Sequence, residues 1–83
     1  MVKETYIAKK TLNERDCAKI VNLNREYTEE EITFIKNGER FDGHSLFNII
    51  NLKPKEGETI EIEIDGPKEE KLLRKNIELL NTL

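Results

Sequence analysis

The stretch TIEIEID, from Thr59 to Asp65, alternates isoleucine with acidic residues more regularly than any other part of the chain. Successive side chains of a strand point to opposite faces, so the isoleucines share one face and the acidic side chains share the other. One face is therefore expected to pack in a core while the other meets water. That division is typical of an antiparallel sheet that is covered on one side only.

Three other segments are predicted to pair with this strand. Val2 to Ala8 is rich in strand-forming residues, although its alternation is imperfect. Glu31 to Lys36 and Glu39 to Asp42 are separated by Asn37-Gly38, and Asn-Gly between two strand-like runs is the strongest short signal for a β-hairpin. The chain is therefore expected to contain four strands.

Two longer segments have the spacing of amphipathic helices. The first runs from about Arg15 to Glu26 and can be capped by Thr11 or Asn13. Its apolar stripe consists of Cys17, Ile20, Val21 and Asn24, with Ala18 beside it. The second is opened by Gly66-Pro67, because proline is tolerated in the first turn of a helix. The buried stripe predicted for it consists of Leu72, Leu73, Ile77 and Leu80.

A shorter helix is predicted between the hairpin and the isoleucine-rich strand. Ser45 is a good N-cap residue, and the helix should end near Leu52 because Pro54 follows closely. The order is then strand, helix, strand, strand, helix, strand, helix. We expect one α+β domain over residues 1–83, in which three helices cover one face of a four-stranded antiparallel sheet.

Composition narrows the classes of function. Fourteen basic and seventeen acidic residues give a formal charge of −3, which does not attract nucleic acid or an anionic membrane. No run approaches the length of a membrane span or signal peptide, so a cytoplasmic protein is expected. Cys17 and His44 are single residues of their type, so neither a disulfide nor a metal site is expected, and no cofactor is implied. Glu29 to Glu31 is interpreted as a solvated loop.

The segment NGERFDGHSLFNIINL, from Asn37 to Leu52, resembles a stretch of the HPr family, the small phosphocarriers of the sugar phosphotransferase system. In that family an Asn-Gly hairpin leads to a regulatory serine that caps a short helix. Gly57-Glu58-Thr59 before the alternating isoleucines is similar to the family's Gly-x-Thr motif. The resemblance covers nearly the whole chain and implies an HPr-like open-faced β-sandwich of order βαββαβα.

The departure from the family lies in the first loop and helix. HPr proteins carry a glycine-apolar-histidine-small-arginine-proline signature there, and the corresponding run from Thr11 to Asp16 reads TLNERD. Asn13 occupies the position of the phosphoryl-accepting histidine, and a carboxamide nitrogen is not a nucleophile. Arg15 matches the phosphate-facing arginine and is interpreted as its remnant. Glu14 and Asp16 are expected to repel a phosphorylated donor.

Ser45 has two compatible readings. Its hydroxyl can cap the short helix, and the resemblance implies phosphorylation by an HPr kinase/phosphorylase followed by binding to a transcription regulator. Leu46, Phe47 and Ile50 form the expected partner-binding patch, with the alternative that they belong to the core together with Ile49 and Leu52. Asn48 stands where the family often has glycine or lysine.

The leading hypothesis is a non-catalytic, HPr-like regulatory protein that is switched at Ser45 and takes part in catabolite repression. One alternative is a diverged HPr-fold interaction protein that is not phosphorylated. Another is a phosphocarrier with a relocated acceptor, for which His44 and Cys17 are the only plausible nucleophiles. The oligomeric state does not follow from any of these patterns.

Overall fold

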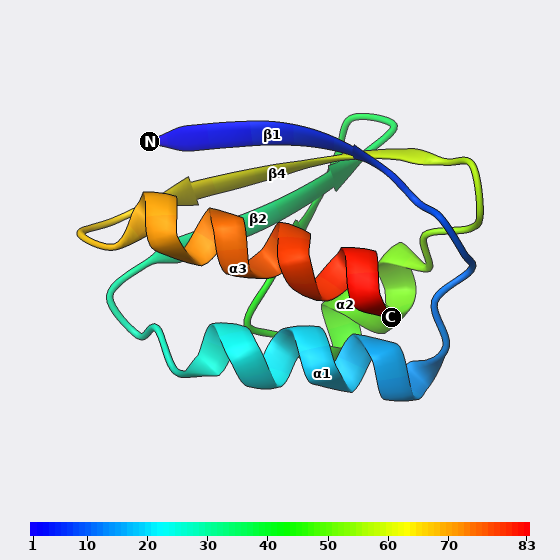
Figure 1. The fold of residues 1–83 in the computed structure, drawn as a ribbon, viewed down its shortest axis with the longest axis horizontal. Helices are drawn as coiled ribbons and strands as arrows, with labels where there is room; N and C mark the ends of the chain where they lie inside the picture. The colour runs from blue at the N-terminus through cyan, green and yellow to red at the C-terminus, as the bar shows by residue number, and fades with distance from the viewer.

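The computed structural model describes residues 1–83, and its helices and strands follow the predicted order βαββαβα (Figure 1). The elements are β1 (Val2–Ile7), α1 (Glu14–Arg25), β2 (Glu31–Lys36), β3 (Glu39–Asp42), α2 (Leu46–Leu52), β4 (Thr59–Asp65) and α3 (Glu69–Thr82). None of the three helices is long and apolar enough to cross a lipid bilayer.

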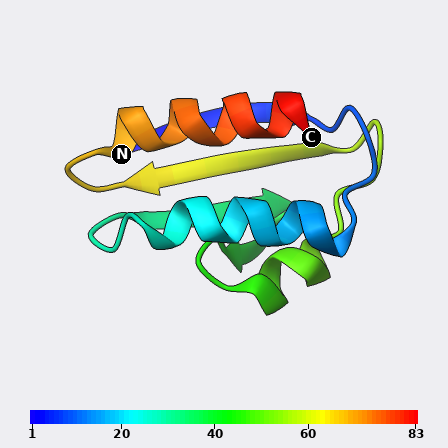
Figure 2. The same cartoon turned by 60° about the horizontal axis from the view of Figure 1, so that its bottom comes forward.

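The four strands form one antiparallel sheet in the order β1-β4-β2-β3. The isoleucine-rich strand β4 is central, as its two-sided pairing with β1 and β2 requires. Ile60, Ile62 and Ile64 are each at most 1% exposed and face the helices. All three helices lie on this side of the sheet, and the opposite face is open (Figures 1 and 2). The predicted fold class is therefore confirmed.

The hairpin between β2 and β3 has the geometry that its sequence predicts. Asn37 and Gly38 have φ angles of 52° and 80°, and they connect Lys36 to Glu39, which are paired across the two strands. Positive φ at both central residues is the requirement of a type I′ turn. Asparagine and glycine adopt that conformation at lower cost than other residues, so this local pair sets the register of β2 against β3.

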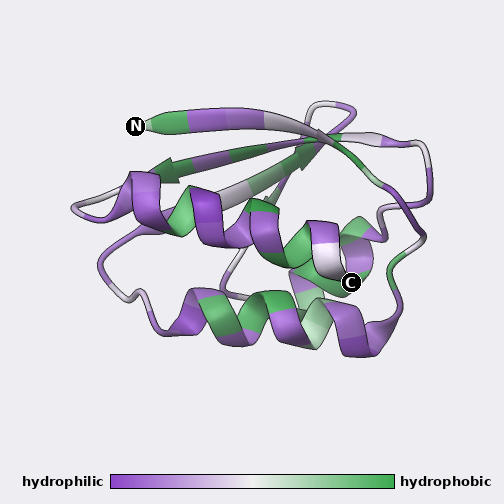
Figure 3. Cartoon of the chain, viewed as in Figure 1, coloured by the Kyte–Doolittle hydropathy of each residue, from purple (hydrophilic) through white to green (hydrophobic).

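A continuous core of sixteen buried residues fills the space between sheet and helices. Its largest fully buried side chain is Phe34 on β2, and Figure 3 shows hydrophobic and hydrophilic residues alternating along β4. The predicted stripe of α3 is partly wrong, because Leu73 and Ile77 are only half-buried. The inward face of α3 instead consists of Leu72, Asn76 and Leu80, which are four residues apart.

The start of α3 also differs from the prediction. The helix begins at Glu69, so Pro67 precedes its first turn instead of lying within it. Gly66 has a φ of 155°, which glycine adopts readily, and its N–H donates to the Glu69 carboxylate at 3.2 Å. This local turn occupies the residues between β4 and α3 and delays the first helical residue.

Candidate functional site

Asn13 is the N-cap of α1, which decides between the two caps that the sequence allows. Its Oδ1 accepts the N–H of Asp16 at 2.8 Å, and the Asp16 carboxylate accepts the N–H of Asn13 at 3.2 Å. This reciprocal arrangement satisfies two of the amides that a helix start leaves without partners. The side chain at the expected phosphoryl-acceptor position is thus occupied in holding the helix.

Asp16 is buried and paired, whereas the sequence places it with Glu14 as a free repelling charge. Lys10 Nζ lies 3.0 Å from the Asp16 carboxylate, whose side chain is only 8% exposed. Burial acts to raise the pKa of Asp16, but the hydrogen bonds from Lys10 and Asn13 and the nearby lysine charge outweigh it, so the pKa lies below its ordinary value. Only Glu14 remains as an exposed carboxylate here.

Replacing Asp16 by asparagine is expected to lower the free energy of unfolding at neutral pH by about 1 kcal/mol, the typical effect of a helix cap. Because the folded-state pKa lies below the unfolded value, the carboxylate stabilises the fold above the unfolded pKa and loses this contribution as pH falls through the folded pKa. Urea unfolding at neutral and strongly acidic pH measures both effects. A difference between wild type and variant that does not shrink in acid would contradict the charge argument, and Glu14→Gln is the exposed control.

A pocket of about 360 Å³ lies beside the start of α1. Asn13 and Ile50 both line it, so two residues that the sequence singles out in separate segments lie close together. Its other lining residues are Thr11, Leu12, Glu14, Cys17, Lys53 and Lys55. Arg15 is the second residue of α1, and its exposed side chain makes no hydrogen bond or ion pair within the chain. The expected phosphate-facing side chain therefore lies in solvent.

Ser45 caps α2, as predicted. Its Oγ accepts the backbone N–H of Asn48 at 3.2 Å and the Asn48 side-chain amide at 3.0 Å. Asn48 Oδ1 in turn accepts the N–H of Asp42, at the end of β3, at 3.4 Å. Asn48 therefore links the end of the hairpin to the serine hydroxyl, a role that no pattern in the sequence indicated.

The apolar residues of α2 divide between core and surface. Ile49 and Leu52 are at most 1% exposed, whereas the side chain of Phe47 is 74% exposed. Leu46 and Ile50 are half-buried against the core. A large apolar side chain in water beside Ser45 fits the docking interpretation, since surfaces that bind proteins are enriched in aromatic residues. The alternative that all five residues belong to the core is wrong for Phe47.

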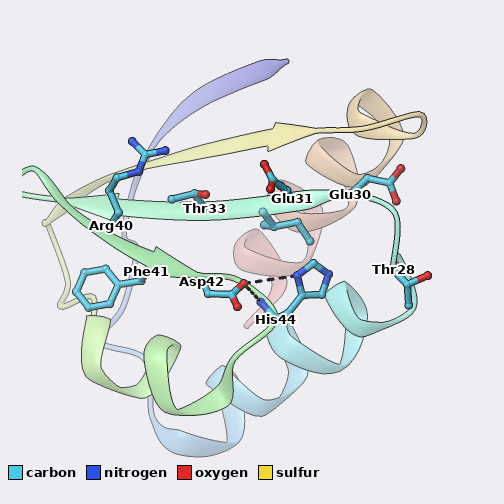
Figure 4. Close-up of a pocket in the computed structure, with 9 residues that line it drawn as sticks. Thr28, Glu30, Glu31, Thr33, Arg40, Phe41, Asp42 and His44 are labelled. Atoms are coloured by element: carbon cyan, nitrogen blue, oxygen red, sulfur yellow. Dashed lines mark hydrogen bonds and ion pairs between the residues drawn. The ribbon is translucent and has the colours of Figure 1, made fainter.

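His44, which the sequence offers as a relocated acceptor, is held in place by the fold. Its Nε2–H donates to the carbonyl of Tyr27 at 3.0 Å, and Nδ1 lies 3.5 Å from Asp42 Oδ1. Figure 4 shows His44 and Asp42 at one end of an open pocket of about 600 Å³, which Thr28, Glu31 and Arg40 also line. The Nε2–H is therefore bound by the protein itself, and the backbone N–H of His44 donates to Asp42 Oδ1 at 2.9 Å.

Cys17 is 2% exposed, and its Sγ–H points at the carbonyl of Ile49 at 3.8 Å. Burial raises the pKa of its thiol, and the negative charges of Asp16 and Glu14 act in the same direction. The nucleophilic form is the thiolate, so Cys17 is poorly suited to attack phosphorus. No group of three or more histidine, cysteine or acidic side chains is placed to hold a metal ion.

Two buried polar features were missed by the sequence interpretation. Glu30 is 5% exposed, not solvated, and its carboxylate accepts the N–H of Lys68 at 2.8 Å. Asn76 is fully buried and donates to Asn24 at 2.8 Å. The partners lie 38 and 52 residues away in the chain, respectively. Neither burial follows from a local pattern.

One family model and several solved structures are similar to this chain. The family model described as the PTS HPr component phosphorylation site matches residues 3–82. HPr-C-His from Thermoanaerobacter tengcongensis has a TM-score of 0.90 at 20% identity, with coverage of 99% of this chain and 93% of that one. HPr from Bacillus anthracis has a TM-score of 0.85 at 22% identity, with 94% of each chain covered.

A third solved structure is that of the Bacillus subtilis catabolite repression protein Crh. Its TM-score is 0.78 at 20% identity, and the alignment covers 99% of this chain and 95% of that one. At such identities the likeness establishes the shared fold. No curated protein matches the chain.

Proposed function

Because this chain belongs to the HPr family, we propose that it is a regulatory binding protein that does not carry a phosphoryl group at the family's histidine position and is switched by phosphorylation of Ser45. The observation that carries the proposal is Asn13 at the cap of α1. The only histidine, His44, lies in a different segment, and its Nε2–H donates to the carbonyl of Tyr27.

The chemistry of Asn13 opposes phosphoryl transfer. The amide nitrogen shares its lone pair with the carbonyl group, so it does not attack phosphorus as a neutral imidazole does. The amide oxygen already accepts the N–H of Asp16. Arg15 remains exposed, so the proposal assigns it to contact with a partner, not to a phosphohistidine.

Ser45 has the chemistry of a phosphoryl acceptor for a kinase. Its hydroxyl oxygen would form the new bond to the γ-phosphorus of ATP while the bond to the β-phosphate oxygen breaks, ADP leaves and the hydroxyl proton passes to a base on the kinase. The product carries a charge of about −1.5 to −2 at neutral pH. The two N–H groups of Asn48 that now reach Ser45 Oγ favour that charge, as does the positive end of α2.

Phe47 supplies the proposed contact surface. It follows Ser45 by two residues and is 74% exposed, with the half-buried Leu46 and Ile50 beside it. A phosphate next to an apolar anchor changes both charge and hydrogen bonding at the edge of a docking surface. The proposed partners are an HPr kinase/phosphorylase, which modifies Ser45, and then a transcription regulator, which reads the modified form.

Intact-mass analysis after incubation with an HPr kinase and ATP tests the switch. The wild-type chain is expected to gain one phosphate, about 80 Da, and the Ser45→Ala variant is expected to gain none. An authentic HPr in the same reaction confirms that the kinase is active. If the control is phosphorylated and this chain is not, the chain is an HPr-fold interaction protein without the serine switch.

Incubation with phosphoenolpyruvate and the general donor enzyme tests the remaining alternative of a relocated acceptor. No phosphoryl group is expected on this chain, because His44 lies outside the loop that precedes α1, where the family carries its histidine, and Cys17 is a buried thiol. A mass gain that disappears in His44→Asn or in Cys17→Ser would replace the regulatory proposal with a phosphocarrier.

A further inference from the structure

Two asparagine side chains lie in the apolar core with no exposed surface. Asn76 on α3 donates from Nδ2 to Asn24 Oδ1 at 2.8 Å and to the carbonyl of Leu72 at 3.0 Å. Asn24 on α1 donates from Nδ2 to the carbonyl of Gly43 at 3.0 Å. Both residues are 0% exposed. A single chain of hydrogen bonds therefore connects α3, α1 and the segment between β3 and α2.

This chain of hydrogen bonds is costly as a means of stabilising the core. Asn76 Oδ1 is buried and has no hydrogen-bond partner. A buried acceptor without a partner loses its hydration with no replacement, whereas two apolar side chains of the same shape would leave only the Gly43 carbonyl without its donor. The pair is better explained by the specific geometry that it imposes than by the stability that it contributes.

What the pair holds is the backbone just before Ser45. Gly43 precedes that serine by two residues, and its carbonyl is the group that Asn24 binds. The end of α1 and the turn that follows it make two further contacts with the segment: Arg25 Nε donates to the carbonyl of His44 at 3.2 Å, and the His44 ring donates to the carbonyl of Tyr27. Figure 2 shows α2 lying beside α1. Of these three links, only that of Asn24 is fully shielded from water.

Asn76 determines which way the Asn24 amide is turned. Because its Nδ2 supplies a donor to Asn24 Oδ1, the amide nitrogen of Asn24 is directed at the carbonyl of Gly43. We propose that Asn24 and Asn76 are positioning residues, which fix the Gly43–His44 segment and thereby present the Ser45 hydroxyl for phosphorylation. The phosphorylation half of this inference rests on the proposed function, whereas the positioning half does not.

The experiment compares Asn24→Leu, Asn76→Leu and the double variant with Ile60→Val. Leucine has the same branching as asparagine but no polar atoms, and Ile60 is a buried residue of β4 that contacts neither asparagine through a hydrogen bond. Amide hydrogen exchange, followed residue by residue by NMR, reports the opening of residues 43–48 without any kinase. Asn24→Leu is expected to speed exchange in this segment by about tenfold more than elsewhere, the factor of one lost hydrogen bond.

The double variant separates positioning from stability. It removes both buried side-chain amides and leaves only the Gly43 carbonyl without its donor, as Asn24→Leu also does. Its melting temperature is therefore expected to lie above that of Asn24→Leu, while residues 43–48 stay as open as in that single variant. In kinase assays the kcat/KM for phosphorylation of Ser45 is expected to fall about tenfold in Asn24→Leu and in the double variant. Ile60→Val is expected to leave it unchanged.

The possible results distinguish the two halves of the inference. A uniform rise in exchange over the whole chain, or an unchanged segment, would overturn the positioning role. A selectively opened segment in a protein that no kinase modifies would support the positioning role and refute the serine switch. A selectively opened segment with unchanged kcat/KM would show that Ser45 phosphorylation does not depend on this geometry.

Discussion

Replacing Phe34 by alanine is expected to lower the free energy of unfolding by about 3–5 kcal/mol. Phe34 is the largest of the fully buried side chains, at 1% exposure, and it lies on β2 opposite Phe41 of β3 and Ile62 of β4. A domain of this length is typically stable by about 4–12 kcal/mol, so the variant is expected to be partly unfolded at 37 °C. Urea titration followed by circular dichroism measures the loss.

Phe47→Ala is the matched control, because it removes the same atoms from a position that is 74% exposed. Its free energy of unfolding is expected to change by less than about 0.5 kcal/mol. The same variant is expected to weaken binding of a regulator to the Ser45-phosphorylated chain, which a titration with the purified partner would measure. Equal losses of stability in the two variants would mean that Phe47 packs against the fold and is not a free docking residue.

The two phenylalanines differ in how well the sequence predicts whether they are buried. Phe34 lies two residues after Ile32, on the same face of the predicted strand, and that periodicity predicts burial. Phe47 lies in a helix of only seven residues, where a periodic stripe is too short to separate an inward from an outward apolar residue. Its exposure depends on how α2 rotates against α1 and β3, which is a property of the tertiary packing.

Local signals also predicted the hairpin and the cap of α2, because both depend on residues next to one another. The hairpin turn forms through the backbone preferences of Asn37 and Gly38 alone. The helix cap forms when the Ser45 hydroxyl accepts the backbone N–H of Asn48, three residues later. Glu30 is different. Its burial follows from the close approach of Gly66, where a Cβ would lie 2.8 Å from the Glu30 side chain, and from the N–H of Lys68. A run of three glutamates contains no sign of either contact.

The residues of the candidate site could also be predicted from the sequence only where a local motif marks them. The sequence could identify Asn13, Arg15 and Ser45 individually, because each stands in a recognisable motif. It could not show that Asn13 shares a pocket with Ile50, because that neighbourhood requires α1 and α2 to pack together. The buried pair of Asn24 and Asn76 was likewise invisible, since a polar residue on an apolar stripe does not reveal its distant partner.

Gly43→Ala is expected to destabilise the fold by about 2–3 kcal/mol through overpacking. A Cβ at Gly43 would lie 2.6 Å from Ile32 Cγ2 and 3.2 Å from Asn24 Nδ2. Ile32 is β-branched and buried, so it has little freedom to move away. The segment itself must shift, which stretches both the bond from Gly43 N–H to the Ile32 carbonyl, now 2.7 Å, and the bond from Asn24. Thermal and urea unfolding measure the cost.

A double-mutant cycle distinguishes this steric argument from a general loss of glycine. Gly38→Ala has open space around its Cβ, so its expected cost of about 1–2 kcal/mol comes from the φ of 80° alone. Replacing Ile32 by alanine removes Cγ2, the nearer of the two Ile32 atoms that Gly43→Ala would meet, and keeps Cβ at 2.9 Å. The cost of Gly43→Ala should therefore fall in part in that background, while the cost of Gly38→Ala stays the same. If the two glycine substitutions respond alike, the close approach to Ile32 is not what requires glycine before Ser45.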